Sequence, residues 1–309
     1  MNIHPGFVGI DISKHHLDIF GVLHGAEQVA NAAPAIAKLA RRCARAGDFV
    51  LFEATGIYDQ LLRQALVRAG VSFARVNPSR AREFAKAAGF LAKTDRIDAR
   101  MLAAMAQALQ PACQAPADPQ RERLARLAKR RDQLVAIRQQ ERTRRHECLD
   151  DEIARDLDHH IAWLGRSIVT LERQIKALLA ENADLNRSQQ LLRSVPGVGA
   201  ITATTLLALL PELGARSPKK IAALAGLAPF NVDSGRFRGK RLIRGGRKRV
   251  RDALYMAAVT AARSQTRFTA FYQSLREAKK PAKLALIALA RKLLITLNAI
   301  LRDQAPFHA

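Results

Sequence analysis

The sequence predicts a mixed α/β domain at the N-terminus, a long helical coiled coil in the middle and a mainly α-helical domain at the C-terminus. Short apolar runs alternate with helical patterns as far as residue 110. Ile and Leu then recur at spacings of four and three over residues 157–178, which is the heptad pattern of a coiled coil. The 309 residues are also enough for more than one domain. We place the domains at residues 1–112, 113–186 and 187–309.

In the first domain, strands come first and strand–helix alternation follows. Phe7–Ile12 is an apolar strand that contains an acid, and Phe49–Glu53 is a later strand that ends in one. Asn77-Pro78 stops the last strand of this domain. The other predicted strands are Leu17–Leu23, Gln28–Ala30 and Phe73–Val76, and the predicted helices are Ala33–Ala46, Ile57–Ala69, Ser79–Ala88 and Asp95–Leu109.

Three prolines between Pro111 and Pro119 mark a boundary, and helical sequence follows from about Gln120 to Glu181. The polar segment His146–Glu152 is the expected bend between two helical arms. A heptad seam on the second arm predicts a coiled-coil hairpin, a dimer or both, and the pattern does not distinguish them. The seam consists of Leu157, Ile161, Leu164, Ile168, Leu171, Ile175 and Leu178.

The net charge of +24 implies a polyanionic partner, most simply nucleic acid. Residues 1–112 carry 14 Lys and Arg against 9 Asp and Glu, a net of +5, whereas residues 213–309 carry 21 against 4, a net of +17. The C-terminal third is therefore the expected phosphate-binding part. Membrane binding is the competing explanation, but no apolar run approaches the roughly 20 residues that span a bilayer, and the N-terminus lacks the features of a signal peptide. We expect a cytoplasmic, nucleoid-associated protein, and three unclustered cysteines agree with a reducing compartment.

Four acids stand out by position. Asp11 lies within the first strand, Glu53 ends a later strand, and Asp95 and Asp98 lie on one face at the start of a helix. If the two strands are neighbours, that helix closes a cluster of four carboxylates suited to Mg²⁺ or Mn²⁺. Each acid also has an ordinary explanation: exposure to solvent for Asp11, an arginine partner for Glu53, and capping of the helix, with Thr94, for the other two. The set as a whole favours a metal site, because acids in apolar strands are costly to bury unpaired.

The segment Asn231–Gly235 places Ser234 among turn-forming residues, directly before a basic run. Residues 235–251 contain nine Lys and Arg and no acid, and four glycines in the run argue against one regular helix. Arginines that hold phosphate oxygens beside a serine hydroxyl suit attack on a phosphodiester, while the local alternative is a turn leading into a solvated basic patch. The candidate nucleic-acid-binding residues here are Arg236, Arg238, Lys240, Arg241, Arg244, Arg247, Lys248 and Arg249.

A second candidate DNA contact precedes this segment. Residues 191–199 run through Pro196, Gly197 and Gly199 into the apolar helix Ala200–Leu210. Helix, Pro-Gly-apolar-Gly turn and helix form the pattern of a helix-hairpin-helix, whose backbone amides bind a DNA phosphate; an ordinary tight connection between helices fits equally well. The other helices expected in this domain are Ile221–Leu227, Val250–Ala262, Thr269–Glu277 and Pro281–Arg302.

Together these motifs resemble those of the DEDD transposases of bacterial insertion sequences, and in particular the insertion-sequence-110 type, the bridge-RNA-guided recombinases. The resemblance covers nearly the whole chain, with the motifs in the same order. Its acidic half rests on Gly9–Lys14, Phe52–Gly56 and Lys93–Ala99. Its second half rests on Ser194–Gly199, Ala225–Pro229, Asp233–Gly235, Ile243–Arg247 and Leu254–Ala258.

The resemblance implies an N-terminal RuvC-type domain with a ribonuclease-H-like fold, in which Asp11, Glu53, Asp95 and Asp98 bind Mg²⁺. It implies that Ser234 is the nucleophile of a C-terminal transposase domain. It also implies an element-encoded bridge RNA that pairs with donor and target DNA, and protomers that assemble as dimers and then as a tetramer. In such an assembly, one protomer's acidic site works beside another protomer's serine.

The sequence thus predicts a DNA recombinase in which Ser234 forms a phosphoserine link to DNA. The link conserves the energy of the phosphodiester, so that rejoining needs no ATP. Two other functions fit the same charge. One is a metal-dependent, structure-specific DNA nuclease that releases hydrolysed products without a covalent intermediate, and the other is a non-catalytic nucleic-acid-binding scaffold.

Overall fold

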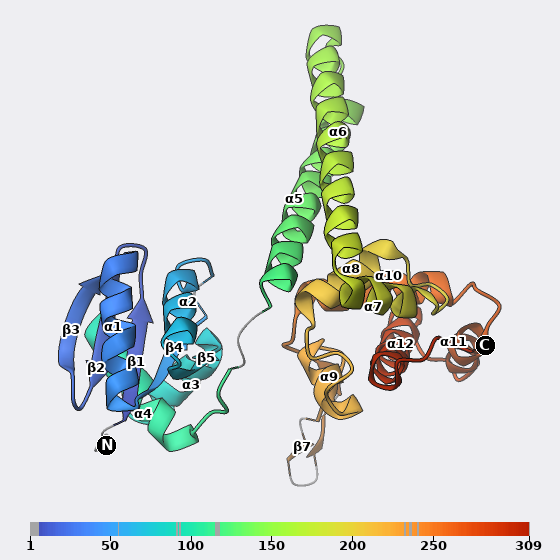
Figure 1. Cartoon of the computed structure of the whole chain (residues 1–309). Helices are drawn as coiled ribbons and strands as arrows, with labels where there is room; N and C mark the ends of the chain where they lie inside the picture. Colours follow the sequence, from blue (N-terminus) through green and yellow to red (C-terminus); the bar gives the residue numbers. More distant parts are fainter. Residues whose placement is uncertain are drawn as a thin grey trace. The chain divides into compact units, whose positions relative to one another are not determined.

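The chain folds as two compact units, Met1–Pro116 and Ala117–Ala309 (Figure 1). The predicted α/β start and the predicted helical remainder are both present. The long middle helices belong to the same unit as the C-terminal helices, and the domain boundary at residue 187 stays a prediction. The computed structural model describes residues 6–54, 56–90, 92, 94–114, 118–231, 233–234, 237–239 and 241–308, with the backbone alone at positions 233, 234, 237 and 238.

A mixed sheet of five strands forms the centre of the first unit. Its strands are β1 (Phe7–Ile12), β2 (His16–Gly21), β3 (Gly25–Ala30), β4 (Phe49–Glu53) and β5 (Ser72–Val76). They lie in the order β3-β2-β1-β4-β5, with β1, β2 and β3 antiparallel and β1, β4 and β5 parallel (Figure 1). This order and the helices that follow are compatible with the predicted ribonuclease-H-like start.

Helices cover both faces of this sheet, which is why its central strands are nearly continuous in apolar residues. α1 (Ala33–Ala46) and α2 (Gln60–Arg68) pack on the face that buries Ile10 and Phe52. α3 (Pro78–Ala87) and α4 (Asp95–Leu109) cover the opposite face, where Leu51 is buried. The predicted elements of this unit are all present, but three of their bounds differ from the prediction by more than one residue. β2 ends two residues early, β3 begins three residues early, and α2 begins three residues late because residues 57–59 form a turn.

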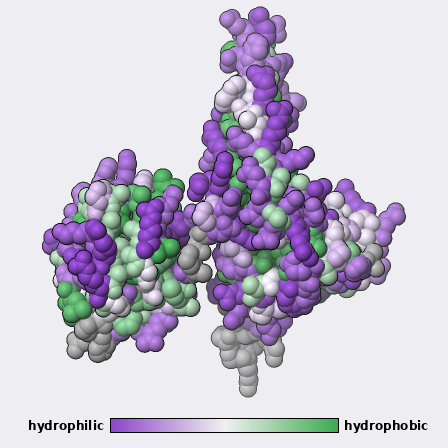
Figure 2. Space-filling model, in the orientation of Figure 1, coloured by the Kyte–Doolittle hydropathy of each residue, from purple (hydrophilic) through white to green (hydrophobic). Residues whose placement is uncertain are grey.

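Two long helices open the second unit as an antiparallel hairpin (Figure 1). α5 (Pro119–Glu147) and α6 (Asp151–Glu181) are joined by three residues, so the predicted bend is confirmed. Leu164 and Ile168 of the predicted seam pack against Leu134 of α5. Figure 2 shows hydrophilic residues along most of the visible face of the hairpin. The packing of the two helices is thus established, whereas their supercoiling stays a prediction.

The core of the second unit forms around its last helix. The helices of this region are α7 (Ala183–Arg193), α8 (Ala200–Leu209), α9 (Pro218–Leu224), α10 (Lys248–Ala261), α11 (Arg267–Glu277) and α12 (Ala282–Asp303). Leu289, Leu293 and Leu297 of α12 are fully buried. Asn298 is also buried, and it is satisfied because its side-chain amide donates to the Arg216 carbonyl and accepts from the Gly214 amide, both at 2.9 Å.

α12 corrects one expectation. By length and composition, α12 is apolar enough to cross a membrane. The expectation that no apolar run approaches the length of a membrane span is therefore wrong for this helix. Its fully buried leucines belong to the core of the unit, and Arg291 and Lys292 interrupt its sequence. Burial inside a globular unit therefore accounts for the apolar residues on the core side of this helix.

In the described part of the segment between α9 and α10 there are four strands of two residues each. They are β6 (Pro229–Phe230), β7 (Asp233–Ser234), β8 (Phe237–Arg238) and β9 (Leu242–Ile243). β6 pairs with β9 and β7 pairs with β8, both antiparallel. The expectation that the basic run is not one helix is confirmed. Strands this short leave no alternating pattern in the sequence, which is why they were not predicted.

Candidate functional site

The acidic site begins with two neighbouring strands. β1 and β4 are parallel, and their last paired residues are Ile10 and Phe52. Asp11 and Glu53 each follow that pair by one residue, at the same edge of the sheet. Because side chains alternate along a strand, both acids face away from the α1–α2 core and toward the α3–α4 face. The predicted neighbouring position of these two acids is confirmed.

α4 then brings the other two acids to Asp11. Gly9 allows this, because a Cβ atom there would lie 2.0 Å from the Ala99 carbonyl oxygen and 2.4 Å from the Ala103 amide nitrogen. Without a side chain at Gly9, the backbone of α4 lies directly against β1. Asp95 and Asp98 occupy the first turn of α4, so close packing of the helix on the strand sets the distance between the acids.

The N-cap of α4 is Thr94. The alternative explanation, that Asp95 and Asp98 cap this helix, therefore does not hold for the N-cap position itself. Its hydroxyl oxygen accepts the Ile97 amide proton at 3.3 Å. Asp95 is the first residue inside the helix, and Asp98 lies three residues later. Negative side chains in a first turn interact favourably with the helix dipole, which offsets part of the cost of gathering them.

Asp11, Asp95 and Asp98 form one cluster, with one carboxylate oxygen from each lying within 4.8 Å of the other two. Burial and the nearby charges of Asp98 and Asp95 raise the pKa of Asp11 to about 6. Three oxygen ligands whose negative charges repel one another fit a hard divalent cation, which would relieve that repulsion. Glu53, half-buried at the end of β4, is not one of these three.

Asp18 is a neighbour of the site that the sequence reasoning missed. It lies on β2 directly opposite Asp11. It is buried, and its two carboxylate oxygens accept from the Gln28 amide nitrogen at 3.0 and 3.2 Å. Its charge adds to the causes that raise the pKa of Asp11. The signal in the sequence was the tight hairpin between β1 and β2, whose three-residue connection, residues 13–15, fixes this register.

A second cluster in the same unit joins His24, Cys43 and Asp48. The His24 Nε2 atom lies 2.6 Å from an Asp48 carboxylate oxygen, and both side chains are almost fully buried. Burial and the charge of Asp48 raise the pKa of the Cys43 thiol to about 12, so the thiol is protonated and unreactive at neutral pH. The cluster ties the β2–β3 turn to the end of α1.

Ser234 is the last residue of β7, where its backbone pairs with Phe237 of β8. The side chains of Ser234 and Arg238 are outside the described part of the structure, as are residues Arg236 and Lys240 altogether. The structure therefore places the backbone of the proposed nucleophile on a short hairpin within the basic segment.

The remaining basic residues of this segment divide into two groups. Arg241 and Arg244 are exposed, and the Arg244 guanidinium lies 5.4 Å from the centre of the Phe230 ring. Lys248 is also exposed and pairs with Asp252 one turn along α10, at 2.6 Å. An exposed pair of this kind is worth little, so these three cations are available to a polyanion.

Arg247 and Arg249 instead hold the second unit together. Arg247 binds both carboxylate oxygens of Glu212, at 2.5 and 2.6 Å, and donates to the Leu209 carbonyl at 3.0 Å. Burial raises the pKa of Glu212, but the hydrogen bonds and charge of Arg247 outweigh it and hold that pKa below its usual value. Arg249 binds Asp132 and so links α10 to α5.

The turn between α7 and α8 has the expected form, a helix followed by a tight turn and another helix. Gly197 has a φ of +87°, and a Cβ atom there would lie 2.6 Å from the Ala257 carbonyl oxygen, so the turn packs closely on α10. Gly199 precedes α8 and faces open space. Its surroundings leave the amide end of α8 accessible, and DNA binding there stays a prediction.

The acidic cluster predicts an unusual response to Asp11→Asn. Because the folded state raises the pKa of Asp11, folded protein binds that proton more tightly than unfolded protein, and stability falls as pH rises from about 4 to about 6. In EDTA at pH 8, Asp11→Asn should therefore raise the melting temperature, by at least about 2 °C after allowance for solvent screening. Mg²⁺ should stabilise the wild type and have much less effect on the variant. Calorimetry of both proteins measures this.

The exposed Asp156 on α6 provides the matched control, because Asp156→Asn removes the same charge away from the cluster. Its melting temperature should follow that of the wild type in EDTA and in Mg²⁺. A lower melting temperature for Asp11→Asn in EDTA, or an undiminished response to Mg²⁺, would contradict the cluster as described.

The two groups of arginines predict opposite phenotypes. Arg247→Ala removes the bidentate pair with Glu212, so it should lower the melting temperature, most clearly above about pH 5, where the depressed pKa of Glu212 contributes to stability. Arg241→Ala should leave the melting temperature unchanged and reduce the salt dependence of DNA binding by about one ion. Melting curves and titrations at several salt concentrations separate the two. If both variants lost DNA affinity equally and neither had a lower melting temperature, the assignment of Arg247 to folding and Arg241 to DNA binding would be refuted.

Comparison with known proteins agrees with this arrangement. Residues 189–273 match the family described as Transposase IS116/IS110/IS902 family, and residues 8–153 match the DEDD transposase model of the IS110 type. The pilin gene-inverting proteins of Moraxella lacunata and Moraxella bovis are each 30% identical over 313 residues, covering 97% of this chain and 97% of theirs.

An insertion-element protein shares a shorter part of the chain. The uncharacterized 42 kDa protein of insertion element IS900 from Mycobacterium paratuberculosis is 34% identical over 155 residues, which cover 48% of this chain and 39% of that protein. The similarity to the two gene-inverting proteins covers nearly all of this chain, and the two transposase models match successive parts of it. Together these matches establish the family. The activity of this family is transposition of insertion sequences, a DNA recombination reaction. The chain belongs to the IS110 family of DEDD transposases.

Proposed function

We propose that the protein is an RNA-guided DNA recombinase that breaks and rejoins strands through a phosphoserine link at Ser234. The observation that carries this proposal is the gathering of Asp11, Asp95 and Asp98 beside a mixed five-stranded sheet in a chain of the transposase family. Acids brought together at an energetic cost, which the raised pKa of Asp11 expresses, are typical of a functional site.

Asp11, Asp95 and Asp98 would hold Mg²⁺ or Mn²⁺, with Glu53 as the fourth ligand from the neighbouring strand. A divalent cation bound there would supply stabilisation of the negative charge that develops on phosphoryl oxygens. The protein's own contribution is to fix the ligands: the β1–β4 register sets Asp11 beside Glu53, and the contact at Gly9 sets α4.

At the serine, the hydroxyl oxygen of Ser234 attacks the phosphorus of a DNA phosphodiester. The bond from phosphorus to one deoxyribose oxygen breaks, the serine proton passes to a carboxylate, and the released oxygen takes up a proton. In rejoining, a deoxyribose hydroxyl attacks the phosphoserine and restores Ser234. Arg241 and Arg244, which are exposed on the same segment, would hold the phosphate oxygens.

The gene-inverting relatives favour a recombinase over a nuclease. They are named as proteins that invert a pilin gene. Inversion requires that a segment be cut at both ends and rejoined in the opposite orientation, so the ends must stay held. A covalent link holds them, whereas hydrolysis releases them. The acidic cluster alone is also compatible with the alternative, a metal-dependent structure-specific DNA nuclease without a covalent intermediate.

Ser234→Ala tests the serine directly. With DNA that carries the element ends, the wild type should form a protein–DNA adduct that survives denaturing detergent, and Ser234→Ala should abolish it. Ser217→Ala is the matched control, because Ser217 is exposed and its side chain makes no capping bond. An adduct in Ser234→Ala would refute the assignment, and strand cleavage by the wild type without any adduct would establish the nuclease.

We further propose that an element-encoded bridge RNA supplies the sequence specificity, and that protomers assemble as dimers and then a tetramer on DNA. The excess of basic residues supports backbone recognition, in which base pairing by a guide carries the choice of sequence. Protein purified from cells that carry its genomic flanks should therefore contain one structured RNA encoded beside the gene. RNA sequencing measures this, and recovery of bulk cellular RNA alone would contradict guidance.

A further inference from the structure

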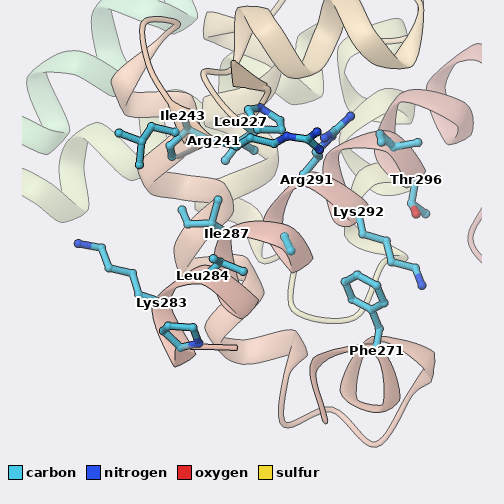
Figure 3. Close-up of a pocket in the computed structure, with 15 residues that line it drawn as sticks. Leu227, Arg241, Ile243, Phe271, Lys283, Leu284, Ile287, Arg291, Lys292 and Thr296 are labelled. Carbon is cyan, nitrogen blue, oxygen red and sulfur yellow. The ribbon is translucent and has the colours of Figure 1, made fainter. Parts of the chain in front are cut away.

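An apolar groove of about 1000 Å³ lies beside the short strands β6 and β9 of the second unit (Figure 3). One wall is α12, which presents Leu284, Ile287 and Ile295. The opposite wall comes from Pro229 of β6 and from β9. In Figure 3, Leu284 and Ile287 lie below Ile243 and Leu227, with Lys283 to the left and Lys292 to the right.

The groove explains why α12 is apolar on more than one side. Its core stripe, which includes Leu289 and Leu293, is fully buried, whereas Leu284 is 50% exposed and Ile287 is half-buried. Leu284, Ile287, Arg291 and Ile295 are spaced three or four residues apart, so they form a second stripe along the same helix. Leu284 is exposed and the other three are half-buried, so this second stripe lies at the surface beside the core.

Positive charge surrounds the apolar floor. Arg241, Lys283, Arg291 and Lys292 line the groove, and among the described residues no Asp or Glu does. The Lys292 ammonium lies 4.1 Å from the centre of the Phe271 ring, which holds it at one end of the groove. A ligand that matches this surface must combine apolar area with negative charge.

We propose that this groove binds a short run of unpaired nucleotides. Unpaired bases present apolar faces that pack against side chains, and their phosphates bind surrounding cations. A duplex does not match, because its outer surface is sugar and phosphate, which an apolar floor would strip of water without compensation. The occupant is therefore single-stranded.

The position of the groove agrees with this ligand. Pro229 and Ile243 are paired residues of β6 and β9, and both line it. The chain reaches β7, which contains Ser234, three residues after β6 ends. The inference rests on the proposed function: strands opened for exchange at Ser234 need a place where their bases can lie, and the groove is next to it in the chain.

Substitution of Leu284 tests the groove. Leu284→Glu places an acid on the apolar floor, and Leu284→Ser removes apolar surface without adding charge. Fluorescence anisotropy with a single-stranded oligonucleotide of about 12 nucleotides should show a dissociation constant raised about tenfold for Leu284→Glu and about threefold for Leu284→Ser. Affinity for a duplex of the same length should change less than about twofold.

The matched control is Leu149→Glu, because Leu149 is 99% exposed at the α5–α6 bend and the change in charge is the same. It should bind both probes like the wild type. Unchanged single-strand affinity in both Leu284 variants would overturn the proposal. Equal losses of affinity for the single strand and the duplex would also overturn it. If single-strand affinity is unchanged, two further results would overturn it: loss of self-association in Leu284→Glu, measured by light scattering, or binding of the wild type to vesicles that both Leu284 variants abolish.

These outcomes separate the groove from the serine chemistry. Ser234→Ala should retain single-strand affinity, because it removes none of the apolar and cationic side chains that line the groove. If the Leu284 variants lose single-strand binding while Ser234→Ala still forms an adduct, the groove stands and the serine assignment fails. If Ser234→Ala abolishes the adduct while the Leu284 variants bind normally, the groove fails and the serine assignment stands.

Discussion

The contact between α4 and β1 at Gly9 is the constraint on which the candidate site depends. A side chain there would overlap the helix backbone, so only glycine lets α4 lie directly against the strand that contains Asp11. Asp95 and Asp98 are then held beside an acid that they repel, and the raised pKa of Asp11 is the consequence. Packing of the helix on the sheet stabilises this arrangement, and the cation that we propose would relieve its repulsion.

The second unit applies its positive charge in two ways. Arg247 and Arg249 are used inside the protein, where they bind Glu212 and Asp132 and fasten the start of α10. Arg241 and Arg244 project from the segment that precedes α10. The apolar residues of α12 are divided in a similar way between folding and surface, because one stripe is buried in the core and another lines the groove. A high net charge thus includes cations that fold the protein and cations that can meet a polyanion.

Much of the fold could be predicted from the sequence, because strands covered on both faces leave continuous apolar runs such as Phe49–Glu53. The four acids could be found because each breaks or ends an apolar run or opens a helix. Other features depend on contacts between distant residues. Arg247 and Arg249 lie 35 and 117 residues from their partners, so a local basic run gives no sign of the pairs. Asp18 required the register of β1 and β2, and two-residue strands are too short to leave a pattern.

The most direct test of the acidic site is a crystal structure with bound Mn²⁺, whose anomalous scattering locates the ion without reference to activity. We expect an anomalous peak between the carboxylate oxygens of Asp11, Asp95 and Asp98, with Glu53 contributing from β4. Coordination distances near those of oxygen ligands would identify the donors. Well-ordered carboxylates without an ion at saturating Mn²⁺, or an ion bound only elsewhere, would contradict the metal site and the DNA strand transfer that we base on it.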